Sequence, residues 1–176
     1  MREARPDEIL PDHCAKDLVV LCCGNMLFGD DGFGPAVAAR LNAEPIPEWA
    51  AVIDAGTGVR ELLFDMVLSE RRPRLVVVVD AVDLGRQPGS VFEIPLERIP
   101  RLEVSEFSVH QAPTSNLLKE LEDQGGVRVV VIVCQVAGMP EEMTEAMSPA
   151  VRDAIGRAAK TIADRFLREP ASARSP

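Results

Sequence analysis

The sequence predicts a three-layer α/β/α sandwich, in which helices cover both faces of a mostly parallel central sheet. Continuous apolar runs, such as residues 18–23 and 75–79, have the composition of strands that are buried on both faces. Segments with an apolar residue at every third or fourth position, typical of amphipathic helices, separate these runs. Strands that alternate with helices pair in parallel, because each helix returns the chain to the start of the next strand.

The first half of the chain predicts two strand–helix units. The strand at 18–23 is followed by a glycine-rich turn and by a helix with an apolar residue every four positions from Phe33 to Leu41. A short strand at 51–54 precedes a second helix. Thr57 is the expected N-cap of that helix, because its hydroxyl can accept a hydrogen bond from a free backbone amide.

The second half completes the sheet around its most apolar strand. Residues 75–79 are consecutive branched aliphatic residues that end at Asp80, and we expect this strand at the centre. Strands are also expected at 127–134 and at 90–94, where the prolines that follow restrict the chain to an edge or a loop. A third helix opens at residues 113–115 between these two strands.

A last helix closes the domain. Ser148 is its expected N-cap and Pro149 its first residue, since proline is tolerated where the helix needs no amide donor. We therefore expect one domain over residues 17–168, with an N-terminal tail at 1–16 and a C-terminal tail at 169–176. A chain of 176 residues, 47% of them hydrophobic, is long enough for one well-buried core and short for two.

Charge and composition exclude several functions. The formal net charge of -9 would repel the phosphate backbone of nucleic acids. No stretch reaches the roughly eighteen apolar residues of a membrane span, and the charged N-terminus does not resemble a signal peptide. We therefore expect a cytoplasmic protein with neither a membrane nor a nucleic acid among its partners.

The four cysteines have no metal-binding spacing. Cys22 and Cys23 are adjacent, so their side chains should point to opposite faces of a strand. Cys23 and Cys134 both end apolar runs of the same sheet, where either could border a pocket as a soft ligand or a reactive thiol. The favoured interpretation is that both are inert, buried thiols, because free cysteine behaves as a small hydrophobe.

Ligands of such sheets bind beyond the carboxyl ends of the strands, which here are followed by the acidic loops 24–31, 54–58 and 80–83. The first loop, GNMLFGDDGFG, joins a strand to a helix as nucleotide-binding loops do. It places Asp30 and Asp31, however, where a phosphate would need amides or a lysine. Two carboxylates suit a cation or a proton transfer instead. We interpret Asp30 as a structural residue that caps the following helix, and Asp31 as the residue of the site.

Two residues from distant segments complete a candidate site with Asp31. Asp80 ends a very hydrophobic strand, where an ionised group is costly unless it meets a partner, a cation or water. His110, just before the third helix, is the better placed of the two histidines for a metal or for proton transfer. Two carboxylates and one imidazole form an open ligand set for a divalent transition metal. Asp54 and Asp83 are weaker candidates, and Asp54 is expected to fix backbone amides.

The segment GNMLFGDDGFGPAV resembles the opening motif of the hydrogenase maturation endopeptidases. Later segments resemble the branch associated with coenzyme F420-reducing hydrogenase: DAGTGVRELLFDM, VVVVDAVDLGRQPG, VHQAPTSNLLKEL and CQVAGMPEEMTEAMSPAV. The resemblance covers residues 18–167 in the expected order. It implies a three-layer α/β fold and an endopeptidase that removes a short C-terminal extension from the large subunit precursor of a NiFe hydrogenase, after nickel insertion.

The resemblance also implies a site. Asp31, Asp80 and His110 match the positions with which the family contacts nickel, and some members have glutamate where this chain has Asp31. The substrate precursor supplies the nickel, so no permanently bound cofactor is expected. Asp31 and Asp80 are the expected catalytic residues, either in an aspartic-type hydrolysis or beside a nickel ion that polarises the peptide. The supporting loop positions are Gly24, Asn25, Asp30, Gly56 and Gly58.

Two other functions are weighed against this one. A non-catalytic nickel-binding chaperone of hydrogenase assembly would use the same acidic residues without cutting the precursor, and the mass of the product distinguishes it from a peptidase. A small nucleotide-binding module is disfavoured by the acids in the glycine-rich loop. Absence of nucleotide protection against thermal unfolding would exclude it.

Overall fold

A five-stranded sheet with the order β2-β1-β3-β5-β4 lies at the centre of the structure, a computed structural model that describes residues 11–101 and 114–168. The strands are β1 (Leu18–Cys23), β2 (Ala50–Gly56), β3 (Leu75–Val82), β4 (Val91–Ile94) and β5 (Arg128–Gln135). All pairs are parallel except that of β5 with the short strand β4 at the edge. The mostly parallel sheet with β3 at its centre is confirmed.

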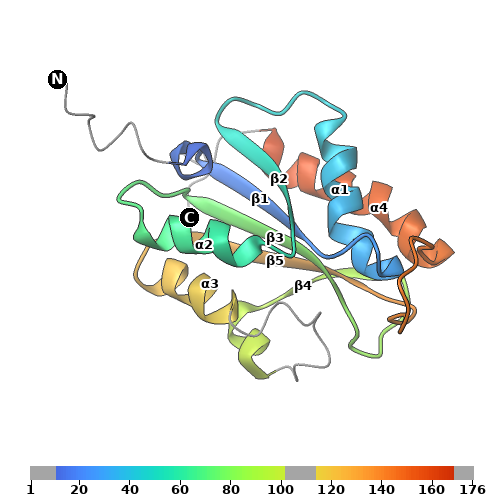
Figure 1. Cartoon of the computed structure of the whole chain (residues 1–176). Coiled ribbons are helices and arrows are strands. Elements are labelled where there is room, and N and C mark those ends of the chain that lie inside the picture. The colour runs from blue at the N-terminus through green and yellow to red at the C-terminus, as the bar shows by residue number, and fades with distance from the viewer. Residues whose placement is uncertain (1–10, 102–113, 169–176) are drawn as a thin grey trace.

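Helices cover both faces of this sheet (Figure 1). Two of them, α1 (Phe33–Asn42) and α4 (Pro149–Ile162), pack on one face, and α2 (Val59–Leu68) and α3 (Thr114–Asp123) pack on the other. Shorter helical segments are η2 (Asp12–Ala15), η3 (Gly29–Gly32), η4 (Leu96–Arg101) and η5 (Ala163–Leu167), the last of which continues α4. The three-layer α/β/α sandwich is therefore confirmed.

The side chains of β3 alternate between two cores. Val77 and Val79 belong to the core beneath α1 and α4, whereas Val76 and Val78 belong to the core beneath α2 and α3. Full burial of each such side chain stabilises the fold by about 1.5–3 kcal/mol. By the same alternation, the side chain of Asp80 faces the layer of α2 and α3.

Two strands extend beyond their predicted ends. The pairing of β3 with β5 continues as far as Val82 opposite Gln135, so Asp80 lies inside the strand and not after it. The predicted strand at 51–54 likewise continues to Gly56, so Asp54 lies inside β2 and not at its end. The apolar pattern marks where a strand is buried, but hydrogen bonds to its neighbour decide where it ends.

The predicted start of α4 is confirmed, and that of α2 is wrong. Ser148 caps α4 by accepting a first-turn backbone amide at 3.4 Å, and Pro149 is the first helical residue. The N-cap of α2 is Gly58 instead of Thr57, and no side chain caps this helix. The reason is a tight turn, in which the amide of Gly58 donates to the carbonyl of Ala55 at 2.8 Å and delays the helix by one residue.

The N-terminal boundary also differs from the predicted tail over residues 1–16. Asp12–Ala15 form η2, and Cys14 is fully buried in the core beneath α2 and α3. Within the described ranges, the packed chain therefore begins before residue 17. The predicted C-terminal tail at 169–176 lies outside them. In the part of the chain that is described, no helix combines the length and the apolarity that a membrane crossing needs.

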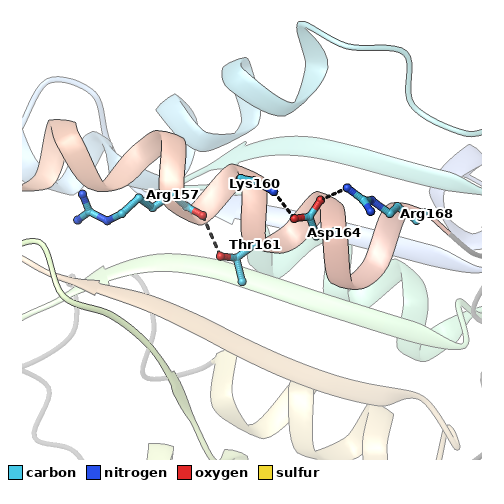
Figure 2. A network of polar contacts seen from close by, with 5 residues as sticks. All are labelled: Arg157, Lys160, Thr161, Asp164 and Arg168. Atoms are coloured by element: carbon cyan, nitrogen blue, oxygen red, sulfur yellow. Dashed lines mark hydrogen bonds and ion pairs between the residues drawn. The ribbon is translucent and has the colours of Figure 1, made fainter.

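A row of charges lies toward the C-terminal end of α4 and on η5. Figure 2 shows Asp164 between Lys160 and Arg168, and Thr161 facing the carbonyl of Arg157. Lys160 donates to Asp164 Oδ2 at 2.5 Å, Arg168 donates to Asp164 Oδ1 at 2.6 Å, and the hydroxyl of Thr161 donates to the carbonyl of Arg157 at 2.9 Å. These side chains are exposed, so the ion pairs contribute little to stability. Asp164 lies roughly 20 Å along the helix from its start. The row is therefore remote from the loops at the carboxyl edge of the sheet.

Candidate functional site

The strand order changes direction between β1 and β3. The chain adds β2 on one side of β1 and then returns to add β3 on the other side. In α/β sheets, ligands bind at the carboxyl edge beside such a switch point. Asp31 follows β1, and Asp80 lies near the end of β3, which pairs with β1 so that Cys22 is opposite Val79. The topology therefore brings these two predicted site residues to the same edge.

The first loop returns so close to β1 that two of its positions accept only glycine. A Cβ atom at Gly24, where φ is +129°, would lie 2.0 Å from the carbonyl oxygen of Asp31. A Cβ atom at Gly34 would lie 2.0 Å from the carbonyl oxygen of Cys23. The backbone amide of Asn25 donates to Asp31 Oδ2 at 2.8 Å, and Asp31 is 3% exposed. The loop therefore holds this carboxylate in a fixed, buried position.

Asp80 is fully buried, and its two carboxylate oxygens have different surroundings. Oδ1 accepts the backbone amide of Ala81 at 2.8 Å, whereas Oδ2 has no hydrogen-bond partner among the described residues. Burial raises the pKa of Asp80 well above its ordinary value, the amide of Ala81 opposes this effect, and the charge of Asp31 raises the pKa further. The two acids therefore influence each other, and Oδ2 can take a proton or contact a cation.

The cysteines at this edge are packed as neutral thiols. Cys22 and Cys23 belong to opposite cores, as predicted, and Cys23 and Cys134 are at most 2% exposed. Burial raises the pKa of Cys134 to about 12. Burial also raises the pKa of Cys23 well above its ordinary value, and the nearby charge of Asp80 adds to this shift. Because the thiolate is the nucleophile and metal ligand, neither residue is poised for that chemistry.

Asp30 has a structural role that differs from the predicted one. It caps neither η3 nor α1. Its carboxylate instead accepts the backbone amide of Ala137 at 2.8 Å, the amide of Ser148 at 2.6 Å and the hydroxyl of Ser148 at 2.9 Å. Asp30 therefore ties the first loop to both ends of the segment between β5 and α4. The prediction of capping failed because these partners are more than one hundred residues away, 107 and 118 along the chain.

The loops after β1 and β2 support each other. The amide of Gly24 donates to the carbonyl of Gly56 at 3.0 Å, and the amide of Gly56 donates to Asp54 Oδ1 at 3.1 Å. Asp54 is exposed and fixes a backbone amide, as its sequence context predicts. Gly58 then begins α2. These contacts make the two loops one support for the carboxyl edge.

His110, the third predicted site residue, lies outside the described residues. Among residues 11–101 and 114–168, no three histidine, cysteine or acidic side chains are arranged to hold a metal ion. Of the three predicted site residues, the structure brings Asp31 and Asp80 to the same edge. The helix α3 starts at Thr114, packs on the face to which Asp80 points, and leads back to the start of β5. Its N-terminus is therefore at the same carboxyl edge.

Gln135 is a buried polar residue of this edge that the sequence patterns above do not single out. Its Nε2 donates to Asp83 Oδ1 and to the carbonyl of Val136, both at 2.9 Å. Its Oε1 accepts the amides of Leu84 at 2.9 Å and of Arg86 at 3.1 Å. One side chain thus holds the loop that follows β3, including the weaker candidate Asp83. A glutamine directly after the apolar run 127–134 was the signal that could have indicated it.

One family profile and several known proteins match the sequence of this chain. The profile of the HycI hydrogenase maturation protease family matches residues 35–165. A putative hydrogenase maturation protease of Methanocaldococcus jannaschii is 34% identical over 82% of this chain and 98% of its own. Subunit delta of the coenzyme F420 hydrogenase of Methanothermobacter thermautotrophicus is 34% identical over 84% and 93%. The hydrogenase 3 maturation protease of Escherichia coli K12 is 34% identical over 76% and 83%.

Solved structures have the same fold. The solution structure of the endopeptidase HycI from Escherichia coli superposes with a TM-score of 0.70 at 26% identity, over 90% of this chain and 99% of that one. The hydrogenase maturating endopeptidase HybD from Escherichia coli superposes with a TM-score of 0.69 over 84% and 90% of the two chains. At 22% identity, the second likeness concerns the fold alone.

Proposed function

The chain belongs to the hydrogenase maturation protease family and is therefore a peptidase, and we propose that it removes a C-terminal extension from the large subunit precursor of a NiFe hydrogenase. The observation that carries the proposal is the buried pair of acids, Asp31 and Asp80, at the switch point of the sheet. A buried carboxylate oxygen without a hydrogen-bond partner is costly. Contact with a cation of the substrate would offset that cost.

We further propose that this site contacts nickel that the precursor already carries, so that the enzyme needs no cofactor of its own. Asp31 and Asp80 supply carboxylate ligands, and His110 supplies an imidazole, which is a favourable set for a divalent transition metal. Two observations support His110. It precedes α3 by four residues in the sequence, and α3 starts at the carboxyl edge on the face of Asp80.

For the hydrolysis itself, we propose an aspartic-type reaction. A water molecule attacks the carbonyl carbon of the scissile peptide, a carboxylate takes its proton, and the proton passes to the leaving amide nitrogen. Asp80 is the candidate that holds a proton during this exchange, because burial and the charge of Asp31 raise its pKa well above the ordinary value of an aspartate. Docked nickel fixes the position of the nearby peptide.

The substrate class and compartment complete the proposal. The similarity to subunit delta of a coenzyme F420 hydrogenase supports a large subunit of the F420-reducing type as the substrate. Four free, buried cysteines fit the reducing environment of the cytoplasm. The net charge of -9 argues against a nucleic acid as a partner.

The experiment compares nickel-loaded and nickel-free large subunit precursors, of the F420-reducing type and of the hydrogenase 3 type, after incubation with the enzyme. Intact mass spectrometry should show loss of the C-terminal extension from the nickel-loaded F420-type precursor alone. Equal processing of the nickel-free form would overturn nickel recognition. If the enzyme binds the precursor but the precursor keeps its full mass, the protein is a chaperone and not a peptidase.

Variants test the site residues. Asp31→Asn, Asp80→Asn and His110→Ala should each slow processing by about a hundredfold or more, as expected when an acid–base group or a ligand is lost. Asp54→Asn is the matched control, because this exposed acid keeps its Oδ1 acceptor for Gly56 and lies outside the acid pair. It should process within about twofold of the parent. Full activity in all three site variants would contradict the site.

A further inference from the structure

Exposed apolar side chains gather on two loops beside the acid pair. Among the described residues, the large hydrophobic side chains that are exposed include Met26 (59%) and Leu27 (45%) in the first loop, and Met139 (45%) and Met143 (72%) in the segment between β5 and α4. We call these four residues the methionine lip. The other two exposed residues of this kind within 11–101 and 114–168, Phe64 and Leu68, lie on α2. The exposure is therefore concentrated at one place.

The two loops of the methionine lip are fastened together. The amide of Gly29 donates to the carbonyl of Thr144 at 2.7 Å, and the amide of Thr144 donates to the carbonyl of Leu27 at 2.8 Å. Phe28 and Thr144 form a parallel bridge. The carboxylate of Asp30 holds Ala137 and Ser148, the two ends of the second loop. The lip is therefore a preformed surface, so a partner would lose less conformational entropy in binding it.

The methionine lip is continuous with the candidate site. Met26 follows Asn25, whose amide donates to the carboxylate of Asp31. The Cα atom of Met26 lies 3.2 Å from the place that a Cβ atom would take on Gly32, the residue after Asp31. A protein that presents a peptide to the acid pair would therefore meet the lip at the same time.

The charge of these loops is of one sign. Glu141, Glu142 and Glu145 are exposed beside Met143 in the second loop. The sequence has no lysine or arginine between Lys16 and Arg40, nor between Arg128 and Arg152. The side chains of the two loops thus combine polarisable apolar groups with negative charge, and Arg152 of α4 contacts the second loop by donating to the carbonyl of Met147 at 2.9 Å. The complement of these loops is a surface with apolar side chains flanked by lysine or arginine.

We propose that the methionine lip, with these three glutamates, is the docking surface for the hydrogenase precursor, on a patch that carries apolar and basic side chains. This inference rests on the proposed function. Methionine side chains are flexible and adapt their shape to an apolar partner. A second copy of this chain fits less well, since a symmetric contact would set glutamates against glutamates. An anionic membrane surface would be repelled in the same way.

The test uses the pair Met139→Ser and Met143→Ser in one variant, with Phe64→Ser and Leu68→Ser as the matched control on α2. Binding to nickel-loaded precursor is measured in an Asp80→Asn background, so that it does not depend on cleavage. The lip variant should bind at least about tenfold more weakly than the control. In the otherwise native enzyme it should raise KM by a similar factor with kcat within about twofold. Thermal unfolding checks that both variants fold.

A second variant tests the charge. Glu141→Gln, Glu142→Gln and Glu145→Gln together should weaken binding and reduce its dependence on salt. Unchanged salt dependence would overturn the basic character assigned to the precursor. Binding of the lip variant equal to that of the control would overturn the docking surface. The docking surface would also be overturned if the parent protein sediments as a dimer and the lip variant sediments as a monomer. The lip variant could lose binding while the parent enzyme never cuts the precursor. That result would support the docking surface and refute the proposed cleavage.

Discussion

Asp30 and Asp31 are adjacent in the chain, yet their carboxylates have different surroundings. Asp30 accepts three hydrogen bonds from Ala137 and Ser148 and thereby joins two loops. Hydrogen bonds to a charged group typically contribute about 1.5–3 kcal/mol each, so Asp30 is a substantial part of the framework. Asp31 instead lies beside Asp80, an acid of which one oxygen has no hydrogen-bond partner in the described structure. Neighbouring residues thus differ in role: Asp30 supports the framework, and Asp31 belongs to the proposed site.

The buried carboxyl of Asp80 makes stability depend on pH. Because its pKa is raised, the folded state keeps a proton that the unfolded state releases above the ordinary pKa of aspartate, about 3.9. Stability is therefore lost as pH rises from that value through the raised pKa. Asparagine cannot ionise, so we expect Asp80→Asn to unfold at a higher urea concentration than the parent at pH 7, and the difference to shrink toward pH 5.

Urea unfolding of the parent, Asp80→Asn and Asp54→Asn at both pH values measures this effect. Asp54 is exposed, so its variant should follow the parent at each pH. Asp80→Asn could be less stable than the parent by the same amount at pH 7 and at pH 5. That result would contradict the claim that ionisation of Asp80 costs stability. In that case the carboxyl would stabilise the fold through its shape or its bond to Ala81 instead of costing stability through its charge.

At the scale of the elements, α1 approaches β1 more closely than a side chain allows. A Cβ atom on Gly34 would meet three backbone atoms of Cys23, the nearest at 2.0 Å, and backbone cannot move aside as a flexible side chain can. This contact seats the start of α1 against the end of β1. The position of Asp31 between these two elements therefore depends on a residue that carries no chemistry.

Two helical glycines make a matched pair of substitutions. Gly34→Ala should destabilise the fold by about 3 kcal/mol, because overpacking forces the helix and strand apart. Gly156→Ala in α4 should stabilise it by up to about 1 kcal/mol, since nothing lies within 4 Å of the added methyl group and alanine favours the helix. Urea unfolding measures both. Equal effects of the two changes would show that helix propensity, and not close packing, governs Gly34.

Across the whole molecule, stability should decrease from the centre of the sheet to its edge. β3 is paired on one side with β1 and on the other with β5, and its burial is complete over all eight residues. β4 has four residues and pairs with β5 alone in the described part of the chain. Local opening needs the fewest broken contacts where pairing is one-sided.

Native-state hydrogen exchange tests this gradient. We expect the amides of residues 75–79 to exchange at least about a hundredfold more slowly than those of Val91–Ile94, because the first should open only with global unfolding. Nuclear magnetic resonance or mass spectrometry can follow both segments in one sample. Similar protection in the two strands would mean that β4 unfolds together with the sheet and is not a weakly held edge.

Much of this architecture follows from local patterns in the sequence. Unbroken aliphatic runs predict buried parallel strands, because only a strand covered on both faces can bury every side chain. The Ser148–Pro149 pair predicts the start of α4, since capping involves atoms within one helical turn. The acids in the first loop disfavour a phosphate ligand, because like charges repel. Such features depend on neighbouring residues, which the sequence displays directly.

Other features were decided only by the tertiary structure, because they depend on residues that are far apart in the chain. Asp31 and Asp80 meet because β1 pairs with β3, and no local pattern specifies that strand order. The true partners of Asp30 lie beyond β5, and Cys14 is buried by a layer formed later in the chain. Sequence alone thus determined the fold class and the candidate acids. Packing and strand order decided which acid supports the framework and which lies beside Asp80, where we propose the chemistry.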